Sequence, residues 1–266
     1  MKEIVDISYL ELFAGYALML IPVFIFWYYK TGLVKDTLWA TIRMTVQLLL
    51  VGFYLDFIFK LDSILVNIVW VLVMSVIASY TIIQRSRLSY RLFLFPVLLS
   101  GIISIAITDA YFLGFVIKLD NVFNARYFIP ITGMLLGNTI RTVILSLDSF
   151  YKKIDDEQTT YRWYLANGAS RKEALQPFMR NALRVAFNPL IATTAIMGLI
   201  SLPGMMTGQI LGGSNPNLAV RYQIMILIII FSSAILNVVL TIWFSNRIAF
   251  DTFDNLRLNI FRKNKK

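Results

Sequence analysis

The 266-residue sequence contains no cysteine and no histidine. Without thiolates the chain has no disulfides or iron–sulfur ligands, and without imidazole it lacks the usual ligands of zinc and haem. Any metal ion that it handles must meet carboxylate, carbonyl, hydroxyl or Met sulfur groups, and the sequence alone assigns no metal ligands. No GxSxG elbow is present either. We therefore expect no enzyme activity, no catalytic residue and no cofactor bound by this chain.

Charge and nucleotide-binding motifs are also scarce. Only 15% of the residues are charged, and no GxxxxGK[ST] loop occurs, so hydrolysis of ATP by a P-loop in this chain is excluded. The net charge of +10 is compatible with nucleic-acid binding in principle. In a chain this apolar, basic residues more often set the orientation in a membrane, so no nucleic-acid partner is predicted.

Apolar residues are abundant instead, at 58% of the chain, with a mean hydropathy of +0.69. Long uncharged runs predict an all-α, multi-pass protein of the cell membrane, surrounded by the lipid bilayer. No repeat or linker divides the sequence, which predicts a single transmembrane domain over residues 1–266. About seven spans are predicted, at 9–29, 37–59, 63–83, 92–117, 127–147, 185–220 and 222–244.

Lys and Arg residues are unevenly divided between the two sides of these spans. One side, with the 30–36 and 84–91 loops, the 148–184 segment and the C-terminus, carries 18, the other side carries five, and two lie within spans. Because cytoplasmic loops are enriched in Lys and Arg, this places the N-terminus outside and the C-terminus inside.

The segment 185–220 contains no charged residue and is too long for one straight span. As a continuous helix it would measure roughly 54 Å, against a hydrocarbon core of about 30 Å. The sequence SLPGMMTG predicts a break in this helix at Ser201, Pro203, Gly204, Met205 and Met206. Residues at such a break are candidates to line a transport pathway or an interface. The two Met sulfurs are soft metal ligands in principle, although adjacent Met residues more often fill space.

The polar segment 148–184 is predicted to form a cytoplasmic helix–Gly–helix element. TTYRWYLAN indicates a short helix that Gly168 ends, and Ser170 with Glu173 forms an S-x-x-E capping box for a second helix. Such an element favours docking of a soluble partner. An amphipathic linker lying on the bilayer is the alternative.

A few polar residues fall inside the predicted spans. Arg43 and Gln47 share one helical face, as do Asn138 and Arg141. Each Arg lies about 9 Å from the inner boundary, so a pathway or interface role and snorkelling to lipid headgroups are both open. Asp56 and Asp109 lie near outer ends of spans, where an interfacial cap is a simpler interpretation than a cation exit.

Several motifs together resemble the FetB-type iron-export permeases of ABC transporters and the plant aluminium-sensitivity membrane proteins related to them. They are IPITGMLLGNTIRTV, LANGASRKEAL, ISLPGMMTGQILGG and AVRYQIMI, in order along nearly the whole chain. The resemblance implies a permease domain that pairs with a separate ATP-binding subunit, which uses ATP and Mg²⁺, and that forms a homodimer. It assigns the contact with that subunit to Leu165, Gly168, Ala169, Ser170 and Glu173.

The resemblance implies export of iron or another metal ion, while the substrate itself stays open. The loop departs from the importer form of ABC permeases, because Arg162 stands where importers have Glu and no I-x-L-P follows. The alternative function is a secondary ion-coupled carrier of a metal or metabolite, in which Asp56 or Asp109 would couple ion movement.

Overall fold

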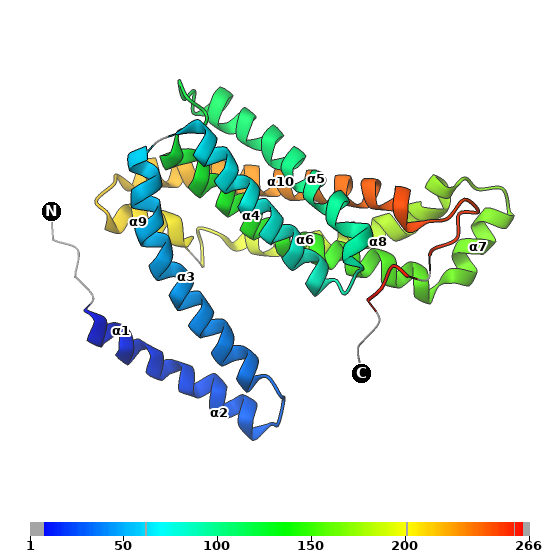
Figure 1. Cartoon of the computed structure of the whole chain (residues 1–266), viewed down its shortest axis with the longest axis horizontal. Coiled ribbons are helices and arrows are strands. Elements are labelled where there is room, and N and C mark those ends of the chain that lie inside the picture. Colours follow the sequence, from blue (N-terminus) through cyan, green and yellow to red (C-terminus); the bar gives the residue numbers. More distant parts are fainter. Residues whose placement is uncertain (1–7, 62, 201, 258, 263–266) are drawn as a thin grey trace.

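The computed structural model describes residues 8–61, 63–200, 202–257 and 259–262, and these residues form helices joined by short loops. The prediction of an all-α protein is confirmed. Figure 1 shows a central bundle with an N-terminal hairpin beside it. The helical elements, in chain order, are α1 (Tyr9–Tyr16), η1 (Ala17–Met19), α2 (Leu20–Tyr28), α3 (Val34–Leu61), α4 (Ile64–Arg85), α5 (Tyr90–Asp109), the π-helical η2 (Ala110–Val116), α6 (Ala125–Asp156), α7 (Gln158–Ala166), α8 (Arg171–Ile196), α9 (Gly204–Leu211) and α10 (Pro216–Ala249).

Six helices in the described part of the chain are long and apolar enough to cross a membrane. They are Leu10–Tyr28, Val34–Leu61, Ile64–Arg85, Tyr90–Val116, Ala125–Asp156 and Pro216–Ala249. Six of the seven predicted spans correspond to them. The seventh, the uncharged segment 185–220, is not among these six, so the count of seven is not confirmed.

The bundle is formed by α4, α5, α6, α8 and α10, which enclose one large apolar core. Its fully buried side chains include Phe93 of α5, Val143 of α6 and Val238 of α10. Because α5 and α10 run antiparallel along most of their lengths, they form the most extensive helix pair of the bundle.

Small polar residues spaced four apart allow this close packing. Ser100 and Ser104 of α5 are fully buried, as is Thr241 of α10, which lies four residues after the buried Asn237. The Ser100 hydroxyl donates to the carbonyl of Pro96 at 2.6 Å, and the Thr241 hydroxyl donates to the Asn237 amide oxygen at 3.1 Å. Hydroxyls bonded within their own helix need no partner across the interface, so the backbones can approach closely.

The bundle has two distinct ends. At the first, which we call the coupling end, α4 and α6 finish, α5 begins, and the C-terminal tail folds back onto the turn after α4. The amide of Ser89 donates to the carbonyl of Ile260 at 2.8 Å, and the amide of Arg262 donates to the carbonyl of Arg87 at 2.8 Å. The basic 84–91 loop, the 148–184 segment and the tail therefore lie together, as the charge pattern predicts. At the opposite end, the far end, η2 finishes and α6 and α10 begin.

The N-terminal hairpin of α1, α2 and α3 lies mostly outside the bundle (Figure 1). Only Ile58 of α3 is buried, where it packs with Ala125 and Ile129 at the start of α6. Tyr16 and Thr45 form a hydrogen bond that ties α1 to α3. Most apolar side chains of the hairpin are exposed on the isolated chain, which in a membrane protein provides surface for lipid or for another protein.

The segment that joins the helix–Gly–helix element to the break differs from the prediction in two ways. The second helix predicted for the 148–184 segment and the start of the predicted broken span form one helix, α8, which continues through Pro177 and Pro189. The break begins at Met197, several residues before the predicted position. Gly198, with φ of 85°, supplies the left-handed residue, while Gly204 is the first residue of α9 and Pro203 precedes it as the N-cap. Ser201 lies outside the described residues.

Candidate functional site

The helix–Gly–helix element at the coupling end forms as predicted. The amide of Gly168 donates to the carbonyl of Leu165 at 3.0 Å, and the amide of Ala169 donates to that of Tyr164 at 3.1 Å. These two bonds form a Schellman motif, which requires a left-handed residue, and Gly168 has φ of 89°. Gly168 is exposed, and a side-chain carbon there would meet nothing within 4 Å.

A reciprocal capping box begins α8 directly after this turn. The amide of Ser170 donates to the Glu173 carboxylate at 2.8 Å, and the amide of Glu173 donates to the Ser170 hydroxyl at 3.4 Å. Hydrogen bonds from the Ser170 hydroxyl and amide hold the pKa of Glu173 below its ordinary value. The direction in which α8 leaves the loop is therefore fixed by residues 168–173.

Tyr161 of α7 fastens the element to the C-terminal tail. Its side chain is 2% exposed, packs against Phe178 and Phe250, and donates to the carbonyl of Asp254 at 2.9 Å. Burial raises the pKa of the Tyr161 hydroxyl to about 12, so it stays a neutral donor at ordinary pH. An ion pair at 3.0 Å between Arg171 and Asp254 adds little because both side chains are about 40% exposed.

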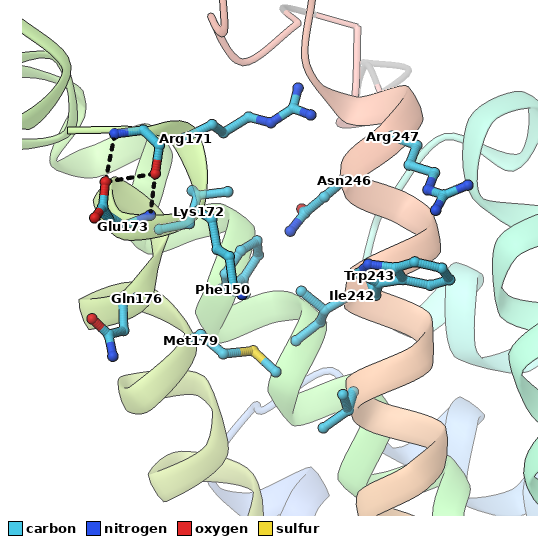
Figure 2. A pocket seen from close by; sticks show the side chains of 13 residues that line it. Phe150, Arg171, Lys172, Glu173, Gln176, Met179, Ile242, Trp243, Asn246 and Arg247 are labelled. Atoms are coloured by element: carbon cyan, nitrogen blue, oxygen red, sulfur yellow. Dashed lines mark hydrogen bonds between the residues drawn. The ribbon is translucent and has the colours of Figure 1, made fainter. Parts of the chain in front are cut away.

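A groove of about 720 Å³ lies beside this element, between the start of α8 and the end of α10. Figure 2 shows α8 and α10 as its walls, with Phe150 of α6 between them and Arg171 and Arg247 at its rim. The Arg247 guanidinium lies 4.1 Å from the ring centre of Trp243. The groove is thus apolar inside and basic at its edge.

The structure does not bring the two predicted intramembrane pairs together. Arg43 and Gln47 are exposed on α3, whereas Asn138 and Arg141 are exposed on α6. The Asn138 amide donates to the carbonyl of Met134 in its own helix at 2.8 Å. Because α3 packs on α6 only near Ile58, the two pairs face different surroundings. On the isolated chain all four residues face outward, where lipid or another protein would meet them.

The predicted break residues lie at the far end. Met205 of α9 packs against an apolar cluster that includes Phe112, Phe128 and Ile226. Pro203 and Met206 are half-buried and Gly204 is exposed. The break thus joins α8, which begins at the coupling end, to a short helix packed on α10.

Asp109 is the residue that sequence reasoning placed wrongly. The sequence favours an interfacial cap, but the side chain is only 2% exposed inside the bundle. Its Oδ2 accepts a hydrogen bond of 2.6 Å from the hydroxyl of Thr132 on α6, and its Oδ1 has no partner. Thr132 lies 23 residues away on another helix, so no local pattern indicates the pair. Asp56, in contrast, is 67% exposed and pairs with Lys60 at 2.6 Å.

No three carboxylates come together among the residues that the structure describes. A metal site built from several acidic side chains of this part of the chain is therefore not preformed.

Comparison with known proteins identifies the family to which this chain belongs. Residues 9–250 match the family described as Uncharacterised protein family (UPF0014). A Bacillus subtilis protein, UPF0014 membrane protein YjkA, is 32% identical over 238 residues, which cover 88% of this chain and 92% of that protein. The Escherichia coli protein named Probable iron export permease protein FetB is 31% identical over 219 residues, covering 82% and 83%. Protein ALUMINUM SENSITIVE 3 of Arabidopsis thaliana is 31% identical over 216 residues, covering 80% and 77%. No solved structure matches the chain.

The apolar helices and their buried interior define a multi-pass membrane protein. More narrowly, the chain belongs to the UPF0014 family of membrane proteins, whose members include a relative named as a permease. The predicted resemblance to the FetB-type and plant aluminium-sensitivity proteins is thereby confirmed. Relatives named as a permease rather than as an enzyme also fit the expectation of a non-enzyme.

Proposed function

We propose that the chain is the permease subunit of an ABC transporter that exports iron or another metal ion. In this proposal a separate subunit binds ATP and Mg²⁺, and two copies of the chain work with two copies of that subunit. The chain itself holds no cofactor.

The observation that carries the proposal is the continuity of α8. The helix begins at the exposed Gly168 turn and ends at Ile196, next to the break. A helix of this length spans roughly 39 Å, so a displacement of the loop is carried through the bundle as a rigid movement. A subunit that binds the 165–173 loop and displaces it would therefore move the break through α8 alone.

We propose seven crossings, with the N-terminus outside and the C-terminus inside. The coupling end carries most of the Lys and Arg residues, which supports a cytoplasmic location. The segment from Arg171 to Leu211 passes from the coupling end to the far end, where α10 begins (Figure 1). It thus supplies the seventh crossing although no single helix of it meets the length and hydropathy of a span.

The homodimer is supported by the outward face of α6. Arg141 and Asn138 are exposed there, and Arg141 is the one charged residue of α6 between positions 127 and 147. A charged group inside the bilayer is costly unless it meets a polar partner. A second copy of the chain, bringing its own polar groups to this face, would satisfy it.

A secondary ion-coupled carrier is the second candidate, and the buried Asp109 favours it. Such carriers bind their coupling ion at acidic residues inside the membrane. The two candidates differ in their source of energy, which makes them separable.

Transport into inside-out membrane vesicles tests the proposal. We would express the chain with and without a candidate ATP-binding subunit from the same organism, and measure uptake of radioactive iron or manganese. Uptake that needs both proteins and hydrolysable ATP, and that survives a protonophore, is expected. Uptake by the chain alone, driven by an imposed ion gradient and abolished by the protonophore, would establish the carrier instead.

A further inference from the structure

Among the described residues, Asp109 is the only buried side chain of the Asp, Glu, Lys and Arg class. No Lys or Arg side chain of the described bundle is buried with it. A buried carboxylate is costly unless it is paired with a positive charge or coordinates a metal. Thr132 supplies one hydrogen bond to Oδ2, while Oδ1 is buried with no partner. The described chain therefore leaves one carboxylate oxygen available for a group from outside.

The backbone changes its winding at this residue. The α-helix α5 ends at Asp109, and the π-helical η2 begins at Ala110. A π-helix is rare and frequently marks a functional site, because it breaks the regular hydrogen-bond pattern and redirects side chains.

Other buried polar atoms without a partner gather at the same end of the bundle. Asn67 near the start of α4, Gln209 in α9 and Gln223 near the start of α10 each have an unpartnered amide oxygen. Gln223 is 7% exposed and Asn67 is fully buried. The indole nitrogen of Trp70, a donor, and the hydroxyls of Ser233 and Ser245 also lack a partner among the described residues, and Ser245 lies near the end of α10 at the coupling end. Three unpartnered amide oxygens in elements at the same end of the bundle as the carboxylate suit a cation.

We propose that Asp109 binds the transported cation inside the bundle of a single chain, between α5 and α6 at the far end. This deepens the proposed function and rests on it for the direction of transport. Carboxylate, hydroxyl and amide oxygens are hard ligands, so the cargo is a divalent ion of the Mn²⁺ or Fe²⁺ kind rather than Cu⁺. A single carboxylate binds weakly, which suits a site that must release its ion.

The site lies apart from the exposed polar face of α6. Arg141 and Asn138 point away from the bundle, whereas Thr132 on the same helix points into it and is fully buried. A cation at Asp109 is therefore enclosed by one protomer and needs no side chain of a second copy.

The alternative is that Asp109 is a permanently neutral acid whose only task is the hydrogen bond with Thr132. Asn has nearly the shape of a neutral Asp and can accept the same bond, but it cannot become negatively charged. Asp109→Asn therefore separates the two roles: it preserves the contact and removes the charge.

Binding of Mn²⁺ to the purified full chain in lipid nanodiscs, without an ATP-binding subunit, tests the site. We expect wild type to bind and Asp109→Asn to lose affinity by about tenfold or more, since even indirect ligand partners are worth that much. Asp56→Asn, which removes an exposed carboxylate, is the matched control and should bind as wild type does. Unchanged binding by Asp109→Asn, or no binding by wild type, would overturn the proposal.

A second measurement on wild type does not depend on folding of the variant. A membrane-soluble carbodiimide adds to protonated buried carboxyl groups, and mass spectrometry identifies the modified peptide. Mn²⁺ should slow modification of Asp109 and leave that of Asp56 unchanged, whereas equal modification with and without Mn²⁺ would contradict the site. Because neither assay uses ATP, a site that persists while ATP-driven uptake fails would refute the proposed transporter class alone.

Discussion

The shape of the 165–173 loop, which we call the coupling loop, depends most on Gly168. Its φ of 89° is a conformation that residues with a side chain rarely adopt, and any other residue there costs about 1–2 kcal/mol. We expect Gly168→Val to insert and express but to lose most of the ATP hydrolysis that the permease stimulates in its partner subunit.

Gly32, in the turn between α2 and α3, provides a matched control. It has φ of 75° and, like Gly168, nothing within 4 Å of an added side-chain carbon. Gly32→Val carries the same backbone strain on the same proposed side of the membrane. Loss of stimulated hydrolysis in both variants alike would mean that strain, not the coupling loop, is responsible.

The Glu173 carboxylate gives the capping box a pH dependence. Because hydrogen bonds from Ser170 lower its pKa in the folded chain, the box stabilises the start of α8 above the ordinary pKa of 4.5, and this is lost as the pH falls through the lower folded value. Amide hydrogen exchange in residues 171–174, corrected for intrinsic rates, should therefore speed up on acidification. Glu173→Gln keeps the box without the charge and should show no such change.

What the sequence reveals at this scale depends on whether a residue acts locally. The Schellman turn and the capping box involve residues at most five apart, so LANGASRKEAL predicts both. The Asp109–Thr132 pair joins two helices, and nothing near Asp109 in the sequence marks it as buried. For Arg43 and Arg141 the sequence shows that they lie within spans but not which way they face.

Among the elements, α8 differs most from the prediction, because its length does not follow from the charge pattern. The charged Arg184 predicts a membrane boundary, and we expected one element on each side of it. A bilayer boundary is not a helix boundary, however, and α8 runs through it and through its two interior prolines, Pro177 and Pro189. The sequence predicts the break at the Pro–Gly pair, but Pro203 is the N-cap of α9, and proline is well suited to the first positions of a helix.

The position of the break yields a paired test. Gly198→Ala forces alanine into φ of 85°, at a cost of about 1–2 kcal/mol, and should lower both thermal stability and transport. Gly204→Ala lies in the first turn of α9 with no atom within 4 Å of the added carbon, so it should leave both unchanged. The melting temperature of the purified chain and uptake in vesicles measure the two effects. The opposite ranking of the variants would place the break at Pro203–Gly204 after all.

For the whole molecule, the number of crossings is the claim on which orientation depends. Because the sequence contains no cysteine, a single introduced cysteine is the only one in this chain that a maleimide can label. We expect Asn167→Cys to react with a membrane-impermeant maleimide only from the cytoplasmic side, and Asp120→Cys and Ser214→Cys only from outside. All three positions are exposed. Labelling of positions 167 and 214 from one side would show that α8 and α9 do not cross.

A cross-link from the coupling loop tests most directly whether the ATP-binding subunit docks there. A benzophenone maleimide on Asn167→Cys, in a complex purified with the ATP-binding subunit, should yield an adduct with that subunit on irradiation. The same reagent on Ser214→Cys, at the far end, should yield none. If the subunit docks on the coupling loop, an adduct forms only from position 167. A complex that assembles normally without that adduct, or a chain that retains no ATP-binding subunit, would contradict it.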